Sequence, residues 1–350
     1  MSIRLPLFLA ASLCLLSATA FSQTTLPTRK KGSDELPTSK AFDPFAKKDK
    51  PAASATQRPA GATTSATTPK GRAEEQLPEA FRACGLSDCK VAEIMPGLTY
   101  YHAHAKNLFA KENDVHILRF DYKNCDARLA YHESCETARK LRTTSEVAKD
   151  YGAIAAVNGG FFTWKLLLPS YVAKVRGKLI KTERAGGSGI AFNDKDKEYV
   201  FGNLSAATIE KYDNAFAGDF VLSGGRNQIP ESQKNAGPAP RTLLGRAPGD
   251  ILWIFVIDGR QKGFSIGINY WEGAELMKMF GCTDGFNHDG GGSSTMVVRK
   301  GALSGKKHSG AATTKSKHPD VEVLNRPSDG TERKVLDQLL ILDARSSIPE

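Results

Sequence analysis

The second part of the chain is a series of short apolar runs separated by turn residues, and the lengths of these runs indicate strands. Residues 153–157 and 251–257 are continuous apolar runs, a pattern typical of strands that are buried on both faces. Residues 115–120 and 127–131 flank a turn-rich connection, so this pair predicts a hairpin. Further strands are expected at residues 171–175, 189–192, 199–201, 295–298 and 338–342.

Helix signals are few. Thr143 or Thr144 can cap a short helix, Glu146 would complete a capping box, and Gly152 would end the helix. Residues 271–280 place three apolar side chains on one face at helical spacing. Many strands, few helices and no regular alternation between them predict an α+β fold, a single mixed-sheet domain with few helices, rather than a doubly wound parallel fold.

The first 80 residues differ in composition from the rest. Residues 1–20 contain Arg4, an apolar run too short to span a bilayer and a small-residue ending at Ala20, as in a secretory signal peptide. Residues 21–80 are rich in Pro, Ala, Ser, Thr and Lys and poor in large apolar side chains, which predicts a disordered linker. We therefore expect an exported protein, periplasmic or secreted and without a membrane span, whose folded domain occupies residues 81–350.

The formal net charge of +10 raises the question of a nucleic-acid partner. The surplus is confined to residues 1–80 and to a Gly/Ser/Thr/Lys-rich segment, 299–318, which carries six Lys and Arg and no Asp or Glu. The remaining residues, 81–298 and 319–350, carry equal numbers of each sign. Single-stranded nucleic acid is bound by cations interleaved with aromatic side chains, which the basic segment lacks, so no nucleic-acid partner is expected.

Five cysteines remain beyond the signal peptide. Export to an oxidising compartment favours two local disulfides, Cys84 with Cys89 and Cys125 with Cys135. The first pair could instead be half of a metal site, although no second pair follows at zinc-finger spacing. Cys282 follows an apolar helical stretch and is expected to be a buried free thiol.

The strongest candidate for chemistry is the ten-residue segment 287–296, Asn-His-Asp-Gly-Gly-Gly-Ser-Ser-Thr-Met. Consecutive glycines allow a sharp turn or the close approach of a ligand to backbone amides. An isolated Asp-Gly-Gly is usually a capped turn, but the number of polar groups gathered here favours a site. The candidate residues of the segment are Asp289, Gly290, Gly291, Gly292, Ser293 and Ser294.

Two further features lie near predicted strand ends. Residues 157–162 place Asn158, Gly159 and Gly160 at the end of a buried run, where an amide and glycine backbone could bind a ligand. An Asn-Gly hairpin turn explains part of the same pattern. Arginines near strand ends suit a phosphate, because the guanidinium can donate two parallel hydrogen bonds. These are Arg241, which Thr242 follows, Arg260 and Arg326.

His102 and His104 would place two imidazoles on one face of a strand, as in a metal pair. No third ligand is evident nearby in the sequence, so a solvated strand is the favoured interpretation.

Taken in order, these motifs resemble the phosphodiester glycosidases, the family related to the enzyme that uncovers mannose 6-phosphate by removing N-acetylglucosamine. The similarity extends over roughly residues 115–342. Two features depart from the family pattern, His288 at a usually apolar position and a basic Gly/Ser/Thr/Lys insertion over residues 299–324. The motifs that carry the resemblance are Arg-Thr-Thr-Ser-Glu, Ala-Val-Asn-Gly-Gly-Phe-Phe, Pro-Arg-Thr, Val-Ile-Asp-Gly-Arg, Gly-Cys-Thr-Asp-Gly, the segment 287–296 and Asn-Arg-Pro-Ser-Asp-Gly.

The resemblance implies hydrolysis of the glycosidic bond of a sugar-1-phosphodiester in an envelope or extracellular glycan. Asp289 would be the principal catalytic carboxylate and Asp258 the second one. No cofactor is required, although the two carboxylates could share a metal. His288 could titrate near neutrality and assist, but its side chain is expected to alternate away from that of Asp289 and to pack in the core. Substrate oxygens would be bound by Asn158, Gly159, Gly160, Arg241, Thr242, Arg260, Gly290, Gly291, Gly292, Ser293, Ser294 and Arg326.

An alternative function from another class is a non-catalytic domain that binds an anionic polysaccharide through the same arginines. An enzyme would need Asp289 for turnover, whereas a binding domain would retain its ligand without turnover.

Overall fold

The computed structural model describes residues 79–347, apart from 87, 135–139, 182–187 and 304–317. The predicted signal peptide and most of the predicted linker lie outside the described residues, as does most of the basic segment 299–318. The last two linker residues, 79 and 80, instead begin the helix α1 (Glu79–Ala83). No helix among the described residues is long and apolar enough to cross a membrane.

Strands of the larger sheet follow the order β1-β2-β3-β15-β14-β16-β12-β10-β11. Three shorter strands, β8, β9 and β13, pair beside this path. The bounds are β1 Lys90–Met95, β2 Leu98–Leu108, β3 Lys111–Asp121, β8 Ala173–Val175, β9 Lys178–Lys181, β10 Ser188–Phe192, β11 Tyr199–Asn203, β12 Asn214–Ser223, β13 Arg226–Asn227, β14 Arg241–Ala247, β15 Ile251–Ile257 and β16 Asp284–Asn287.

A second sheet has the order β18-β17-β5-β19-β4, and β6 and β7 form a separate small hairpin. The bounds are β4 Ala127–Glu133, β5 Ala155–Asn158, β6 Phe162–Thr163, β7 Leu168–Pro169, β17 Met296–Arg299, β18 Val321–Val323 and β19 Asp337–Asp343.

Antiparallel pairing accounts for every strand pair in the described part of the chain. The expectation of many strands and few helices is confirmed, but the expected mixed sheet is corrected to antiparallel sheets. Several neighbouring strands follow each other through short turns, as β2 and β3 do, and such turns allow only antiparallel pairing.

The hairpin predicted from residues 115–120 and 127–131 is wrong, although both strands exist. Both edges of β3 are occupied, one by β2 and the other by β15. The chain therefore leaves the larger sheet after β3, and β4 pairs with β19 in the second sheet.

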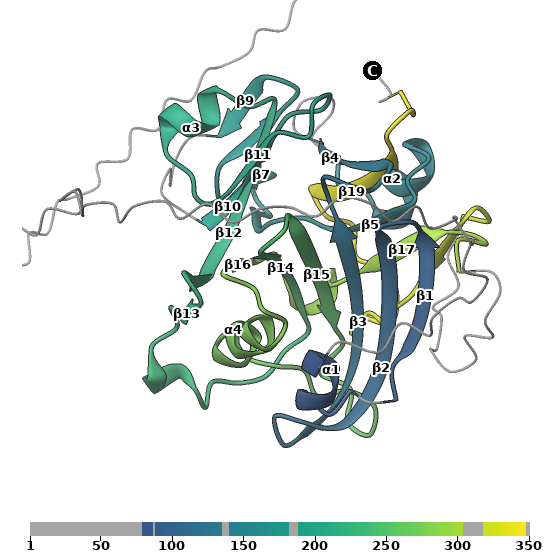
Figure 1. The fold of residues 1–350 in the computed structure, drawn as a ribbon, viewed down its shortest axis with the longest axis vertical. Helices are drawn as coiled ribbons and strands as arrows, with labels where there is room; N and C mark the ends of the chain where they lie inside the picture. Colours follow the sequence, from purple (N-terminus) through teal and green to yellow (C-terminus); the bar gives the residue numbers. More distant parts are fainter. Residues whose placement is uncertain (1–78, 87, 135–139, 182–187, 304–317, 348–350) are drawn as a thin grey trace, which may run out of the picture. The chain divides into compact units, whose positions relative to one another are not determined.

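Four α-helices are described, α1 Glu79–Ala83, α2 Thr144–Asp150, α3 Ala206–Glu210 and α4 Tyr270–Met279. The predicted capping box of α2 is confirmed, because Thr143 N donates to Glu146 Oε2 at 2.8 Å and Glu146 N donates to Thr143 Oγ1 at 3.2 Å. Figure 1 shows α2 beside β5 and β19, and α4 beside β14 and β16, in agreement with their contacts.

Side chains from both sheets share one apolar cluster. It includes Phe120 and Phe286 from the larger sheet and Tyr131, Val157 and Leu339 from the second sheet. The two sheets therefore pack against each other through this core. One consequence concerns β16 and β17, which are consecutive along the chain but belong to different sheets. The residues between them, 288–295, cross from one sheet to the other, and we call them the glycine segment.

Two cysteines predicted to pair are free thiols in the structure, so the expected disulfide between Cys84 and Cys89 is corrected. The Cys84 thiol turns toward α4, where its sulfur lies 3.2 Å from Met279 Sδ. The Cys89 thiol donates to the carbonyl of Lys90 at 3.5 Å. Burial raises the pKa of Cys84 to about 11 and that of Cys89 to about 12, which keeps both protonated at neutral pH.

The other cysteine predictions have different outcomes. Cys125 is a buried free thiol, and its predicted partner Cys135 lies outside the described residues. Cys282 is a buried free thiol, as predicted, and burial raises its pKa far above the usual range.

Candidate active site

The glycine segment is held by backbone hydrogen bonds to two neighbouring strand ends. His288 N donates to the carbonyl of Thr242 at 2.8 Å, and Asp289 N donates to the carbonyl of Gly159 at 3.0 Å. Gly291 N donates to the carbonyl of Pro240 at 3.0 Å. The motifs around residues 158–160, 240–242 and 287–296, which are far apart in the sequence, are therefore brought together as predicted.

Close neighbours explain why glycine occupies this segment. A Cβ atom at Gly290 would lie 2.7 Å from the carbonyl oxygen of Pro240. Gly291 has a φ of 64°, and a Cβ there would lie 2.9 Å from the Arg260 guanidinium. A Cβ at Gly292 would clash with the Asp329 carboxylate and the Arg333 guanidinium. Larger residues would therefore displace charged side chains from the segment.

Asn158 lies at the end of β5 and is fully buried. Its Oδ1 accepts hydrogen bonds from Thr242 Oγ1 at 2.7 Å and from Thr295 N at 3.1 Å. Its Nδ2 donates to the carbonyl of Asp289 at 2.7 Å. The side chain is thus placed to hold Asp289 and the neighbouring strand together, and Thr242 is buried in the same network.

Asp289 is half-buried at the start of the glycine turn. Its Oδ2 accepts a hydrogen bond from Ser293 Oγ at 2.6 Å, and Arg333 Nη1 donates to the same hydroxyl at 3.4 Å. Burial raises the pKa of Asp289, while the Ser293 hydroxyl, the Gly290 amide and the charge of Arg333 oppose that rise. A more basic carboxylate with a positioned hydroxyl is suited to proton transfer.

Three guanidinium groups surround the glycine segment. Arg260 and Arg333 lie against Gly291 and Gly292, as the short distances to a Cβ at these positions indicate. Arg241 lies beside Gly290, donates from Nε to the carbonyl of Ile268 at 3.1 Å, and stacks 4.1 Å from the Tyr270 ring centroid. Arg333 was not identified from the sequence, where no motif marks it.

Two further predicted site residues adjoin the Ser294 end of the glycine segment through Asn325, whose Nδ2 donates to the carbonyl of Ser294 at 3.0 Å. Arg326 is exposed, with its guanidinium 5.1 Å from the Phe264 ring centroid. Asp258 is buried, where its carboxylate accepts from Asn325 Nδ2 at 2.8 Å and from Arg326 N at 2.7 Å. No interaction in the described part of the chain joins Asp258 to Asp289. Asp258 is linked to the glycine segment indirectly, through Asn325.

A comparison with family models decides which family these motifs belong to, because the model of the phosphodiester glycosidases matches residues 151–342. The chain belongs to the phosphodiester glycosidase family. The matched range contains the glycine segment, Asn158 and the three surrounding arginines. A search of curated proteins found no match.

Solved structures share the fold at low sequence identity. A hypothetical protein from Synechocystis matches with a TM-score of 0.56 and 12% identity over 72% of this chain and 63% of its own, so this chain spans less than two thirds of it. The catalytic domain of zebrafish N-acetylglucosamine-1-phosphodiester alpha-N-acetylglucosaminidase, auto-inhibited by its pro-peptide, matches with a TM-score of 0.51 and 20% identity over 73% of this chain and 87% of its own.

In this phosphodiester glycosidase fold, a second carboxylate near Asp289 comes from β12. Asp219 accepts hydrogen bonds from the hydroxyls of Tyr171 and Tyr270, the latter at 2.7 Å. Its charge contributes to the raised pKa of Asp289. The only signal in the sequence is an acidic residue inside the otherwise apolar run of 215–222.

A third carboxyl group, Asp337, lies beneath the glycines of the 158–160 motif. Its Oδ2 accepts from Tyr131 Oη at 2.5 Å and from Gly160 N at 3.2 Å. Complete burial raises its pKa to about 7, and the charges of Glu133 and Asp289 add to that rise. Asp337 is therefore partly neutral at physiological pH.

His288 packs in the core, as predicted. Its ring lies 5.3 Å from that of Phe216 and 5.1 Å from that of Phe286, and Nδ1 is 3.0 Å from the carbonyl oxygen of Asn158. Burial lowers its pKa to about 4, so the imidazole is neutral.

Two cavities of the protein are lined by residues other than those of the Asp289 site. A cavity of about 440 Å³ is lined by residues around His132 and Arg142, and another of about 380 Å³ by residues around Tyr199 and Arg246. Neither cavity is lined by Asp289 or by the arginines that surround the glycine segment.

Proposed function

We propose that the protein is an exported hydrolase that cleaves the glycosidic bond of a sugar-1-phosphodiester in an envelope or extracellular glycan. One observation carries this proposal: the hydrogen-bonded pair of Asp289 and Ser293 lies on a glycine segment surrounded by Arg241, Arg260 and Arg333. A carboxylate beside three guanidinium groups suits a substrate that carries both a glycosidic bond and a phosphate.

The reaction breaks the bond between the anomeric carbon and the phosphate oxygen. The bonding electrons leave with that oxygen, water supplies the hydroxyl of the released sugar, and the remaining proton ends on the phosphomonoester or in solvent. A phosphate is a weakly basic leaving group, so the arginines can replace much of the work of a general acid by neutralising charge.

Asp289 acts in this proposal as the principal carboxylate, and Asp219 takes the place that the sequence assigned to Asp258. Glycosidases use two carboxyl groups that flank the scissile bond, and positive charge develops on the sugar in the transition state. The charge of Asp219 acts directly on Asp289, whereas Asp258 is linked to the glycine segment through Asn325. Tyr171 and Tyr270 hold Asp219 in place.

Substitution of Asp289 tests the proposal most directly. Asp289→Asn should lower kcat/KM for a chromogenic sugar-1-phosphodiester by more than about 100-fold, because the carboxylate is the group that transfers the proton. The melting temperature should stay nearly unchanged, since the amide keeps the shape of a side chain whose charge is costly to bury. Asp320→Asn, at an exposed position, is the matched control and should keep full activity.

Full turnover in Asp289→Asn would overturn the assignment of this residue. Ligand retention by the wild-type protein without any turnover would instead support the non-catalytic, anionic polysaccharide-binding alternative.

The role of the phosphate is tested with Arg241. Arg241→Gln should lower kcat/KM for the sugar-1-phosphodiester by about 10- to 100-fold, since hydrogen bonds to charged groups contribute about 1.5–3 kcal/mol. A neutral aryl glycoside of the same sugar should be affected far less. Arg326→Gln, which changes an arginine stacked on Phe264, is the control. Equal losses with both substrates would show that Arg241 does not act on a phosphate.

A further inference from the structure

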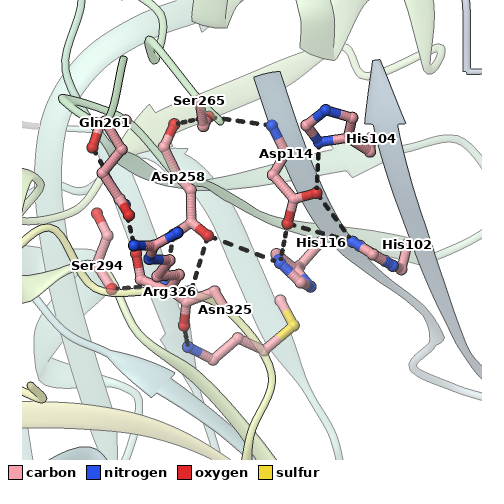
Figure 2. Close-up of polar contacts among 12 residues, drawn as sticks. His102, His104, Asp114, His116, Asp258, Gln261, Ser265, Ser294, Asn325 and Arg326 are labelled. Carbon is pink, nitrogen blue, oxygen red and sulfur yellow. Dashed lines mark hydrogen bonds and ion pairs between the residues drawn. The ribbon is translucent and has the colours of Figure 1, made fainter. Parts of the chain in front are cut away.

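A second group of functional side chains lies in the β2–β3 hairpin, apart from Asp289. His102, Asp114 and His116 form a buried group that we call the histidine cluster. Their side chains are 7%, 3% and 0% exposed. Figure 2 shows the imidazoles of the hairpin turned toward the Asp114 carboxylate, with Asp258 on the other side of His116.

Strand register brings these residues together. His102 and His116 are direct partners across the β2–β3 pair, and His104 is the direct partner of Asp114. Side chains two positions apart point to the same face of a strand, so both positions of each strand face one side. The third ligand that the sequence did not reveal therefore comes from the neighbouring strand.

The potential ligand atoms converge at metal-site distances. His102 Nε2 lies 3.1 Å from Asp114 Oδ1, and His116 Nε2 lies 3.0 Å from Asp114 Oδ2. The three ligand atoms all lie within 4.8 Å of one another. Bonds of about 2.0–2.1 Å to a tetrahedral zinc ion place the ligand atoms about 3.3 Å apart, so only small movements are needed to admit an ion.

An outer shell orients the cluster. Tyr100 Oη lies 2.7 Å from His116 Nδ1, which leaves Nε2 of that ring directed at Asp114. Ser265 Oγ accepts from the backbone N of Asp114 at 3.0 Å and donates to the carbonyl of Asp258 at 2.7 Å. Metal-binding histidines usually have their second ring nitrogen held by a hydrogen bond, as Tyr100 holds Nδ1 of His116.

Charge balance also points to a cation. Asp114 and Asp258 are both buried, and Asp258 Oδ2 lies 4.0 Å from His116 Nε2. Among the described residues, the ion-pair partners of these two carboxylates are imidazoles rather than Lys or Arg. A divalent cation with two neutral histidines would balance both negative charges without a buried excess.

We propose that the histidine cluster binds a divalent transition metal of the zinc class through His102, Asp114 and His116, with Asp258 as a buried counter-charge beside it. Two imidazoles and one carboxylate are a donor set that such ions accept, and a softer thiolate is not needed. Asp258 also accepts from the amide of Arg326 and from Asn325. The ion would therefore tie the hairpin to the turns that carry Arg260 and Arg326, a structural role separate from the reaction at Asp289.

His104 lies beside the histidine cluster and is partly exposed, so an ion would enter the cluster from this side. Its side chain is 35% exposed, and its Nδ1 lies 3.1 Å from Asp114 Oδ1. His104 also contacts Glu112, so it adds a further polar contact to the outside of the cluster.

The test measures metal binding rather than activity. The full chain is stripped with a chelator and titrated with Zn²⁺ by calorimetry, and the melting temperature is followed with and without the ion. We expect one Zn²⁺ per chain and a higher melting temperature, because an ion that binds only the folded state stabilises it. His102→Gln and Asp114→Asn should each weaken binding by more than about 100-fold, beyond the 10- to 100-fold cost of losing an outer-shell partner.

The matched control is His132→Gln, a histidine of the second sheet that contacts Tyr151 and Ser134 and no member of the cluster. This variant should bind Zn²⁺ as tightly as the wild type. Absence of stoichiometric binding by the wild-type chain would overturn the proposal, as would unchanged binding in both His102→Gln and Asp114→Asn. Either result leaves the assignment of Asp289 untouched, because that assignment is read from turnover.

Discussion

At the scale of single residues, the environments of three carboxyl groups differ in a way that suits distinct roles. Asp289 has a hydroxyl and a cation beside it, Asp219 has two tyrosine hydroxyls, and Asp337 has complete burial with one tyrosine and one amide. Burial raises the pKa of Asp289 and of Asp337. Burial thus favours the protonated form of both Asp289 and Asp337, which is the form that can donate a proton.

The raised pKa of Asp337 predicts how the stability of the protein depends on pH. Its pKa rises from 3.8 in the unfolded chain to about 7 in the folded protein. Between these values the unfolded chain has released the proton and the folded protein still binds it, so rising pH lowers the free energy of unfolding across this window. Asp337→Asn cannot titrate. The free energy of unfolding of Asp337→Asn should be nearly equal to that of the wild type at about pH 4. Above pH 7 it should be larger by as much as about 4 kcal/mol.

Urea unfolding of both proteins across this pH range measures that difference. Asp343→Asn is a suitable control, because Asp343 is at the exposed end of the same strand and its pKa is lowered by Arg345. A difference between Asp337→Asn and the wild type that does not change with pH would contradict the burial argument.

Residue-level chemistry was only partly predictable from the sequence. Asp289, Arg241 and Arg260 carry a local signal in the sequence, because glycines and strand ends mark them. Asp258 has the same signal, a carboxylate directly after a buried strand, yet it faces the histidine cluster. Asp219 and Arg333 reach the site through strand pairing and a loop, and neither type of proximity leaves a local pattern in the sequence.

At the scale of elements, local signals predicted strands and helices better than their partners. The capping box of α2 and the apolar runs of β5 and β15 depend only on neighbouring residues, and all three elements are present. The partner of β4 depends instead on which strand edges remain unoccupied after the larger sheet has formed. The same limitation concealed the histidine cluster, since its members are joined by strand pairing and not by sequence spacing.

The β6–β7 hairpin is the element that extends from the 158–160 motif, and it carries an exposed aromatic side chain. Trp164 is 59% exposed, and the Arg333 guanidinium lies 6.0 Å from its ring centroid. Exposed apolar side chains beside a polar site often mark a binding surface. We expect Trp164→Ala to raise KM for a glycan-linked substrate by about 5- to 10-fold, the loss of about 1 kcal/mol of contact, and to leave kcat nearly unchanged.

Leu166→Ala provides the control in the same hairpin, since Leu166 is similarly exposed, at 57%, but has no aromatic ring to stack on a substrate. Steady-state kinetics on both variants give the KM and kcat values that test this prediction. Equal KM values for Trp164→Ala and the wild type would remove Trp164 from the substrate surface.

At the scale of the whole molecule, the site exists because two sheets meet. β16 and β17 belong to different sheets, and the glycine segment between them carries Asp289 across the junction. Asn158 from the second sheet hydrogen-bonds to Thr242 of the larger sheet and to the carbonyl of Asp289. Sheet packing and site geometry are therefore coupled through one buried amide.

Asn158→Ala should show this coupling as a loss of both stability and activity. It removes the partner of Thr242 Oγ1 and of the Asp289 carbonyl in a fully buried place, which should cost about 2–4 kcal/mol. For a folded unit of this size, that loss should lower the melting temperature by about 5–15 °C. Thr242→Val, which keeps the side-chain shape but removes one donor, should cost less, because only Asn158 Oδ1 loses a partner and it still accepts from Thr295 N.

Differential scanning calorimetry and turnover measured on the same samples distinguish a positioning residue from a ligand-binding one. A substrate-binding role for Asn158 would lower activity without a change in melting temperature, which is the pattern expected of Asp289→Asn. A buried amide that joins the sheets and positions Asp289 would instead lower both the melting temperature and the activity. Both losses would then be larger in Asn158→Ala than in Thr242→Val.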